Sequence, residues 1–409
     1  MSETETILCS FCGKNKQDTN ILIAGNDSHI CDTCIEQAHG IVKEDAVAKH
    51  TLLEDFKLLK PKAIKDYLDD FIIGQDDVKR VISVSVYNHY KRLLQPDISK
   101  DDIDIEKSNI IMVGRTGTGK TLIAKTIARL LKVPFCIADA TVLTEAGYVG
   151  EDVESILTRL LQSADYNLEK ARRGIVFIDE IDKVARKSDN PSITRDVSGE
   201  GVQQAMLKLL EGTIVNVPPQ GGRKHPDQKM IALDTKDILF ISGGAFDGIE
   251  KHISRRMNTR SIGFRSEKDE AIDKEQLLKY ISPQDLKSFG LIPELIGRMP
   301  VVSHLNPLDR KALKQILTEP RNALIKQYKK LFEMEGIALT FDDKAINIIV
   351  DKSMEFRLGA RGLRSICEAI MLDAMFELPS DEVKKELRIS DAYVKAQLSK
   401  SSLTNLRVA

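Results

Sequence analysis

The residues best suited to catalysis lie in a glycine-rich stretch, Gly114 to Thr121, which reads GRTGTGKT. Its spacing is that of a phosphate-binding P-loop. Gly117 and Gly119 let the backbone curl so that several N–H groups point at phosphate oxygens, and a helix that starts here adds its dipole. Lys120 can then reach the β- and γ-phosphates, and the Thr121 hydroxyl can ligate Mg2+. The residues expected around the nucleotide here are Gly114, Arg115, Thr116, Gly117, Thr118, Gly119, Lys120, Thr121 and Leu122.

Two adjacent carboxylates, Asp179 and Glu180, follow the apolar run 174–178. Asp179 would hold Mg2+ at the carboxyl end of a parallel strand, where open α/β sheets bind their ligands. Glu180 would activate a water for attack on the γ-phosphate. A solvated strand end explains most isolated pairs of this kind. Downstream of a P-loop, however, the pair indicates hydrolysis of ATP or GTP rather than binding alone.

A third group of reactive residues is the set of cysteines near the N-terminus. Their pattern, C-x2-C-x18-C-x2-C, fits a tetrahedral zinc site made by Cys9, Cys12, Cys31 and Cys34. So small a segment has little core, so the metal would supply much of its folding energy. Disulfides are the alternative, and they are disfavoured in a cytosolic chain. Cys136 and Cys367 lie in apolar surroundings and are expected in the core.

These groups need elements that hold them together. An apolar strand at 109–113 precedes the P-loop and a helical pattern at 122–128 follows it, which disfavours an ordinary glycine turn. Further strands are expected near 134–138, 174–178 and 237–241, with helices between them. This alternation predicts an α/β fold with a doubly wound parallel sheet. From Pro307 onward the pattern changes to a second, helical unit.

Composition sets limits on the function. Lys plus Arg number 60 and Asp plus Glu number 61, so the charge balance gives no reason to expect nucleic-acid binding. No apolar run approaches the roughly 18 residues of a membrane span, and the first ten residues do not have the form of a signal peptide. We therefore expect a cytoplasmic protein without a membrane or nucleic-acid partner.

Three motifs leave alternatives open. Ile73, Gly74 and Gln75, in FIIGQ, either cap the adenine or belong to a plain helix–turn–helix. Tyr148, in GYVG, lies either in a mobile loop with an exposed ring or in a turn with a buried one. The tripeptide at 262–264, IGF, is either a docking tip or an anchor packed on its own domain.

Taken in order, the motifs resemble those of one family. The zinc knuckles, FIIGQ, GRTGTGKT, GYVG, IVFIDEID, GGRKHP, IGF, ELIGR and GARGLR follow one another as in the ClpX family of AAA+ protein unfoldases, over essentially the whole chain. The resemblance implies an AAA+ P-loop NTPase with a helical small C-terminal domain. Its implied domains are a zinc-binding dimerisation domain at 1–50, a linker at 51–62, a large ATPase domain at 63–305 and a small domain at 306–409. Arg115 stands where the family usually has proline; because contact there is through the backbone, function should survive.

The resemblance also implies a homohexameric ring with ATP at the subunit interfaces. Arg298 in ELIGR resembles the arginine that reaches the neighbour's γ-phosphate, and Arg361 in GARGLR resembles the sensor arginine of the small domain. Both are planar, permanently charged groups that suit developing phosphate charge. Together with Lys120, Asp179 and Glu180, they are the expected catalytic residues, with ATP, Mg2+ and Zn2+ as cofactors.

Substrate and partner contacts follow from the same resemblance. The expected pore residues are Tyr148, Val149, Arg223, Lys224 and His225. Ile262, Gly263 and Phe264 match the tip that docks on the ClpP peptidase, a tetradecamer of stacked rings. The implied activity is ATP-dependent unfolding and translocation of tagged or unfolded proteins, some brought by adaptors, with delivery to ClpP and a chaperone role. The chain itself would be an ATP hydrolase and not a peptidase.

Two other classes of function compete with this interpretation. A clamp loader or helicase with a zinc knuckle would also hydrolyse ATP, but the neutral charge and the lack of an aromatic–basic stripe oppose it. A zinc adaptor with a vestigial ATPase is opposed by the intact Lys120, Asp179, Glu180 and Arg298.

Overall fold

The structure is a computed structural model of the 409-residue chain. It describes residues 8–40, 58–95, 103, 105–144, 151–185, 199–218, 230–258, 274–356, 359–380 and 385–400. The chain divides into two compact units, Met1–Lys57 and Leu58–Ala409, and each is described by itself.

The first unit is a small hairpin followed by a helix. A short 3-10 turn, η1 (Lys16–Asp18), leads to strands β1 (Leu22–Ala24) and β2 (His29–Cys31), which pair antiparallel. A helix begins directly after β2, at Asp32. Among the described residues of this unit, the buried apolar side chains are those of Cys9 and Cys31. The hairpin therefore lacks the hydrophobic core that would stabilise so small a fold on its own.

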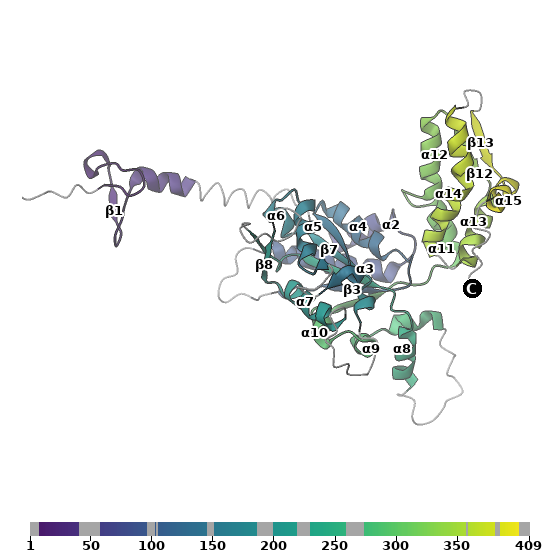
Figure 1. The fold of residues 1–409 in the computed structure, drawn as a ribbon, viewed down its shortest axis with the longest axis horizontal. Coiled ribbons are helices and arrows are strands. Elements are labelled where there is room, and N and C mark those ends of the chain that lie inside the picture. The colour runs from purple at the N-terminus through teal and green to yellow at the C-terminus, as the bar shows by residue number, and fades with distance from the viewer. Residues whose placement is uncertain are drawn as a thin grey trace, which may run out of the picture. The chain divides into compact units, whose positions relative to one another are not determined.

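The second unit is built on a five-stranded parallel sheet (Figure 1). In spatial order its strands are β11 (Val301–His304), β3 (Ile110–Val113), β10 (Leu239–Gly244), β7 (Ile175–Asp179) and β4 (Phe135–Asp139). Every residue of β3 and β10 is buried, as is typical of the central strands of a parallel sheet covered on both faces. Four of these strands confirm the sequence prediction. The fifth, β11, was not predicted.

Helices cover the sheet and carry the connections between its strands. They are α2 (Pro61–Asp69), α3 (Asp76–Leu93), α4 (Lys120–Leu131), α5 (Ser155–Ser163), α6 (Leu168–Ala171), α7 (Glu200–Glu211), α8 (Ile249–Asn258), α9 (Pro283–Phe289) and α10 (Pro293–Gly297). Helix α4 shows why they form, because its buried residues Ile123, Ile127 and Leu131 recur every four positions along one face. Short 3-10 turns lie at η2 (Ala140–Val142), η3 (Ile181–Val184) and η5 (Lys274–Tyr280).

Two small strand pairs lie outside the main sheet. Strands β5 (Leu143–Thr144) and β6 (Glu151–Asp152) pair parallel on either side of 145–150, the segment that contains Tyr148 and Val149. Strands β8 (Ile214–Val217) and β9 (Ile231–Asp234) pair antiparallel on either side of 219–229. The sequence motifs GYVG and GGRKHP therefore lie in connections that begin and end at paired strands.

The C-terminal part has a core of its own. Helices α11 (Arg310–Thr318), α12 (Leu324–Met334), α13 (Asp343–Glu355), α14 (Gly359–Glu377) and α15 (Asp391–Lys400) pack around the parallel strands β12 (Ala338–Phe341) and β13 (Glu386–Ile389), and η6 (Leu378–Ser380) follows α14. Cys367 lies in this core and Cys136 in the core of the main sheet, which confirms the prediction for both. The fold is the predicted one, a parallel α/β sheet joined to a helical C-terminal unit.

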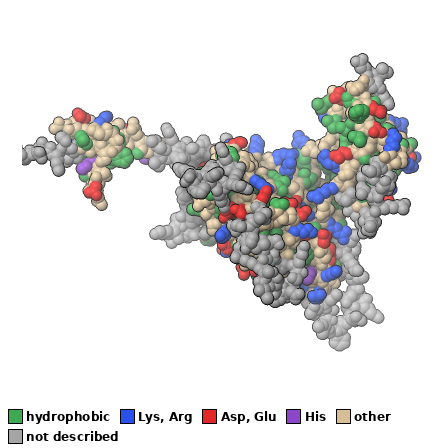
Figure 2. Space-filling view, in the orientation of Figure 1, with side chains coloured by type: hydrophobic (Ala, Val, Ile, Leu, Met, Phe, Trp, Pro, Cys, Tyr) green, Lys and Arg blue, Asp and Glu red, His purple; other side chains and the backbone are tan. Residues whose placement is uncertain are grey.

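Several large apolar side chains remain exposed on α12 and α14, and Met354 of α13 is exposed as well. Figure 2 shows green side chains gathered on this part of the surface. They come from α12 and α14: Leu331, Met334, Leu372, Met375 and Phe376. Phe376, at 83% exposure, is the most exposed of this group. None of the helices in the described ranges has the length and hydropathy needed to span a bilayer.

Candidate functional sites

The P-loop has the conformation that phosphate binding requires. Gly117 and Gly119 adopt φ angles of 81° and 108°, a region that favours glycine. Helix α4 starts at Lys120, and its N-cap, Gly119, provides no side-chain hydrogen bond. The first N–H groups of the helix thus remain available to an anion, with the helix dipole directed at it. A side chain at Gly114 would meet Leu305 at 2.8 Å, so the loop also packs tightly against the end of β11.

Lys120 is held inside this loop. Its Nζ donates to the carbonyl oxygens of Gly114 and, at 3.2 Å, Arg115. Burial lowers the pKa of Lys120, while the charges of Asp179 and Asp182 oppose that change. A phosphate at the loop would offer the ammonium a charged acceptor, and such hydrogen bonds are stronger than those to neutral carbonyls.

Thr121 and Asp179 come together at the carboxyl end of the sheet. The Thr121 hydroxyl donates to Asp179 Oδ2 at 3.1 Å, although the two residues are 58 positions apart. Both groups are hard oxygen ligands, so the pair fits Mg2+, which is usually bound through one or two such protein groups together with phosphate. Glu180 follows with a left-handed φ of 56°, and its N–H donates to Asp179 Oδ1 at 3.0 Å. This turn leaves the Glu180 side chain exposed, beside the pair.

The neighbouring strand end explains why Gly243 and Gly244 are glycines, and it shows a role for Asp182, to which the sequence assigned none. Asp182 is 6% exposed, and its Oδ1 accepts the N–H of Ala245 at 3.1 Å. A Cβ at Gly244 would lie 2.7 Å from that oxygen, and one at Gly243 would lie 2.7 Å from the ring of Phe177. Both positions therefore require glycine, which lets β7 and β10 approach closely at the site. The third carboxylate of IVFIDEID was the signal that could have identified Asp182.

A cavity of about 780 Å³ connects these groups with the C-terminal helices. Lys120, Thr121, Asp179 and Glu180 line it from the sheet, and α14 contributes Arg361, Arg364 and Ser365. The charge of Arg361 acts on Lys120 and contributes to the lowering of its pKa. The start of α14 also approaches the P-loop, because a Cβ at Gly359 would lie 3.3 Å from the Thr116 carbonyl oxygen. The arrangement provides backbone donors, two kinds of cationic side chain and four carboxylates around one cavity.

Other predicted residues lie elsewhere. Gln75 makes a reciprocal pair with the backbone of Asn306: its Nε2 donates to the carbonyl and its Oε1 accepts the N–H, both at 2.8 Å. Ile73, Gly74 and Gln75 do not line the cavity, whereas Phe71, the first residue of the same FIIGQ motif, does. Adenine contact by FIIGQ stays a prediction.

Arg298 lies outside the cavity as well. It follows α10, with its side chain 53% exposed, and its Nη2 donates to Glu211 Oε1 at 2.9 Å. The predicted pore and docking residues fall outside the described residues: Tyr148, Val149, Arg223, Lys224, His225, Ile262, Gly263 and Phe264.

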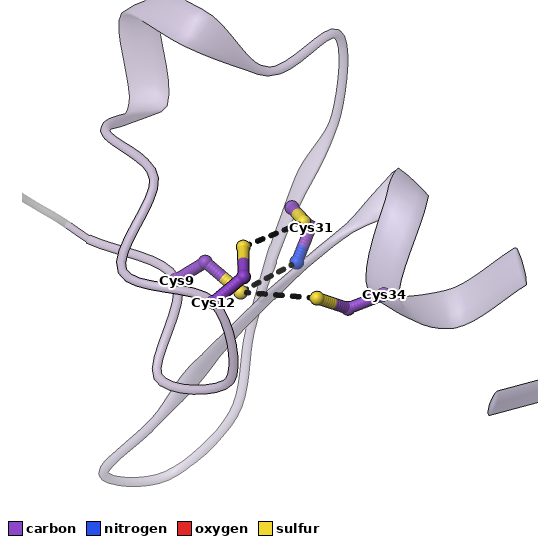
Figure 3. Close-up of side chains that lie close together, drawn as sticks. All are labelled: Cys9, Cys12, Cys31 and Cys34. Carbon is purple, nitrogen blue, oxygen red and sulfur yellow. Dashed lines mark hydrogen bonds between the residues drawn. The ribbon is translucent and has the colours of Figure 1, made fainter. Parts of the chain in front are cut away.

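The four N-terminal cysteines converge on one point (Figure 3). Their sulfurs all lie within 4.8 Å of one another; Cys9 and Cys34 are 3.9 Å apart, and Cys12 and Cys31 are 3.5 Å apart. In a tetrahedron with Zn–S bonds of about 2.3 Å, the sulfurs are about 3.8 Å apart. The observed spacing therefore fits one zinc ion.

Electrostatics at the cysteines also favour a cation. Burial raises the pKa of Cys9, but backbone N–H groups, including that of Cys31 at 3.3 Å, outweigh it and lower the pKa to about 6. The pKa of Cys34 is raised to about 12, first by its hydrogen bond with Cys12 and then by burial. A bound metal ion would lower the pKa of Cys34 again, because a thiol that coordinates a metal loses its proton.

Comparisons with known proteins agree with both sites. Residues 105–302 match a family described as "AAA domain (Cdc48 subfamily)", residues 7–44 match "ClpX C4-type zinc finger", and residues 308–390 match "C-terminal, D2-small domain, of ClpB protein". A Bacteroides thetaiotaomicron protein called "ATP-dependent Clp protease ATP-binding subunit ClpX" is 65% identical over 407 residues, which cover 98% of each chain. Proteins with the same name from Bacteroides fragilis (64%, 98% of each chain) and Porphyromonas gingivalis (62%, 96% of each) are similarly close.

These likenesses extend over nearly the whole length of the chain. They include the zinc segment that contains Cys9 to Cys34 and the ATPase segment that contains Lys120 and Asp179. The nucleotide cavity and the four-cysteine cluster are the parts that such a protein needs. The chain belongs to the ClpX family of AAA+ ATPases, the ATP-binding and non-peptidase subunits of Clp protease.

Proposed function

We propose that this protein is an ATP-driven unfoldase and translocase that passes protein substrates to the ClpP peptidase and also acts as a chaperone. The observation that carries the proposal is the cavity at the P-loop. Lys120, Thr121 and Asp179 line it from the sheet, and Arg361 lines it from a separately packed helical unit. Nucleotide bound there would touch both parts, so hydrolysis would change the contacts that join them.

Five of the residues that line the cavity have a proposed role in hydrolysis. Thr121 and Asp179 hold Mg2+, which neutralises phosphate charge, and Lys120 binds the β- and γ-phosphates. The exposed carboxylate of Glu180 positions the attacking water. Arg361 contacts the phosphates from α14, so that binding and loss of the phosphates change the contacts between the small domain and the site.

A ring of identical subunits would bury two features that are exposed in a single chain, namely Arg298 and the apolar side chains of α12 and α14. Arg298 is exposed and does not line its own cavity, which suits an arginine that serves the neighbouring site. The apolar face of α12 and α14 would be covered by the next subunit. We propose a homohexamer whose subunits have the domain boundaries 1–50, 51–62, 63–305 and 306–409.

Substrate handling is proposed for segments outside the described residues. Tyr148 and Val149 would grip polypeptide in the axial pore, with Arg223, Lys224 and His225 at its entrance. The tip at 262–264 would dock on a tetradecamer of ClpP. The zinc segment would receive adaptors and some substrates, in the cytoplasm.

The test uses a stably folded fluorescent reporter that carries a degradation tag. Full-length protein with ATP should abolish the fluorescence, faster and irreversibly when ClpP is present. Protein without ATP, and the Glu180→Gln variant with ATP, are the controls. Fluorescence that persists with ATP and ClpP, for several tags, would refute the proposed function.

A further inference from the structure

One buried amide joins three segments of the ATPase unit. Gln203 lies on α7 and is 0% exposed. Its Nε2 donates to the carbonyl oxygens of Val184 at 2.8 Å and Gly290 at 3.2 Å. Its Oε1 accepts the N–H of Ile292 at 2.8 Å. The neighbours of Gln203 on the buried face of α7, among them Val202 and Met206, are apolar, so the amide stands in a hydrophobic core.

The first of these bonds reaches the acidic segment of the ATP site. Val184 is the last residue of η3, which follows directly after Asp179 and Glu180. Within the same turn, Asp182 lines the cavity and accepts the N–H of Ala245. The Gln203 bond to Val184 and the Asp182 bond to Ala245 thus hold the turn at two places.

The other two bonds reach the helix that ends at Arg298. Gly290 and Ile292 lead into α10, which has five residues (Pro293–Gly297) and has Arg298 as its C-cap. Figure 1 shows α7 and α10 near each other, and the two helices are in contact. A helix of this length is about 8 Å long and moves as a rigid piece. A shift at Ile292 would therefore be transmitted to Arg298.

We propose that Gln203 is a positioning residue that couples a subunit's own acidic segment to the arginine it offers its neighbour. The coupling rests on the proposed function, because Arg298 must act in the next subunit. A buried amide costs stability unless it is hydrogen-bonded. The three bonds of Gln203 therefore fix the position of η3 relative to the residues that lead into α10. A methionine of similar volume would fill the same space without forming any of the three bonds.

Mixed rings can test both directions of the coupling. Glu180→Gln subunits cannot hydrolyse ATP but still supply Arg298, whereas Arg298→Ala subunits retain Glu180 but supply no arginine. The two full-length chains are co-expressed with different tags, and rings that contain both are purified. In these rings, ATP can be hydrolysed at a site where an Arg298→Ala subunit supplies Glu180 and its Glu180→Gln neighbour supplies Arg298. Gln203→Met is then added to one type of subunit at a time.

The coupling predicts a loss in both placements. In the Glu180→Gln subunit, Gln203→Met should lower the kcat of the neighbouring site on the order of tenfold, with KM unchanged, because Arg298 is displaced. In the Arg298→Ala subunit, it should lower kcat by displacing Glu180. Gln204→Met, at the exposed adjacent position on α7, is the matched control and should leave both values unchanged.

The outcomes separate the two proposals. The mixed rings are compared with rings made of Glu180→Gln subunits alone and with rings made of Arg298→Ala subunits alone. If the mixed rings hydrolyse no more ATP than these, the action of Arg298 in the neighbouring site is refuted, and with it the coupling. Active mixed rings whose kcat falls in one placement only, or in neither, would refute the coupling and leave the proposed function intact.

If Gln203→Met does not fold, Gln203→Glu serves instead. Glutamate retains the acceptor for Ile292, but when ionised it faces the Val184 and Gly290 carbonyls without a donor. Protonation restores one donor, so its kcat relative to the parent should rise as the pH falls from 8 to 6. A kcat equal to that of the parent at every pH would refute the role of Gln203.

Discussion

Breaking the buried ion pair between Arg256 and Asp285 should strongly destabilise the ATPase unit. The side chain of Asp285 is 2% exposed, and its two oxygens accept from Arg256 Nε and Nη2, both at 2.9 Å. Oδ2 also accepts the N–H of Ser282 at 2.8 Å and its hydroxyl at 2.7 Å, which caps α9. The pair joins α8 to α9, the two sides of the segment 259–273 that contains the predicted docking tip.

Replacing Asp285 with asparagine should destabilise this region by about 3 kcal/mol. Removing one charge of a buried pair costs about 3–5 kcal/mol, because the other charge stays buried without its partner. The Arg256 side chain is 22% exposed, so water solvates part of the guanidinium left behind. The cost should therefore lie at the lower end of that range.

The loss should depend on pH in a defined direction. Burial raises the pKa of Asp285, but hydrogen bonds from Arg256 and Ser282 outweigh it and hold the pKa below its ordinary value. A depressed carboxyl pKa adds stability that is present above the unfolded pKa, about 3.9 for aspartate, and is lost as pH falls through the folded pKa. The difference between parent and Asp285→Asn should be full at pH 7 and should shrink below about pH 4.

Hydrogen exchange at peptides from α8 and α9 measures the local free energy of opening in the full chain, which avoids assuming two-state unfolding. The matched control is Asp351→Asn, which breaks an exposed pair: Arg310 donates to Asp351 at 2.7 Å and 3.2 Å, and the two side chains are 51% and 56% exposed. Water screens both of those charges, so exchange at α11 and α13 should change little. Equal effects of the two substitutions would show that burial does not determine the contribution of these pairs.

Three further predictions test separate parts of the proposed function. Glu180→Gln should bind ATP normally and hydrolyse almost none, because the phosphate contacts remain while the group that positions water is lost; near-parental turnover would refute this role. Protein purified without oxygen should hold about one Zn2+ by metal analysis and Cys34→Ala should release it, whereas a zinc-free parent would rule out the site. Tyr148→Ala should retain ATPase activity but slow the unfolding of a stable substrate, since the ring offers a large contact area with two torsions to fix; a parental unfolding rate would contradict a gripping role.

The sequence predicted the elements whose signals are local. Strands β3 and β7 are apolar runs that end at recognisable phosphate and metal motifs, and the structure brings Thr121 and Asp179 to 3.1 Å as that pattern requires. Strand β11 was missed because VVSH is four residues long, follows a proline and ends in two polar residues. Its strand conformation depends on pairing with β3, about 190 residues earlier, and no local pattern encodes such a contact.

Gln75 makes a second contact that no local pattern indicates. Its motif lies just before the ATPase core, but its amide pairs with Asn306, 231 positions away, at the start of the C-terminal unit. Asparagine and glutamine side chains can pair with any exposed backbone amide, so their sequence context does not identify their partner. Residues that contact phosphate or metal are different, because the chemistry limits both their type and their spacing.

Asn109 illustrates what only the three-dimensional structure could reveal. It is 1% exposed and directly precedes β3; its Nδ2 donates to the Arg298 carbonyl at 2.9 Å, and its Oδ1 accepts the N–H of Phe240 at 3.2 Å. One amide therefore holds together the strand that enters the P-loop, the strand β10 beside it and the end of α10. Gln203 ties the start of α10 to α7 and to the turn after β7, and Asn109 ties its end to β3 and β10, so the backbone that carries Arg298 is held at both ends.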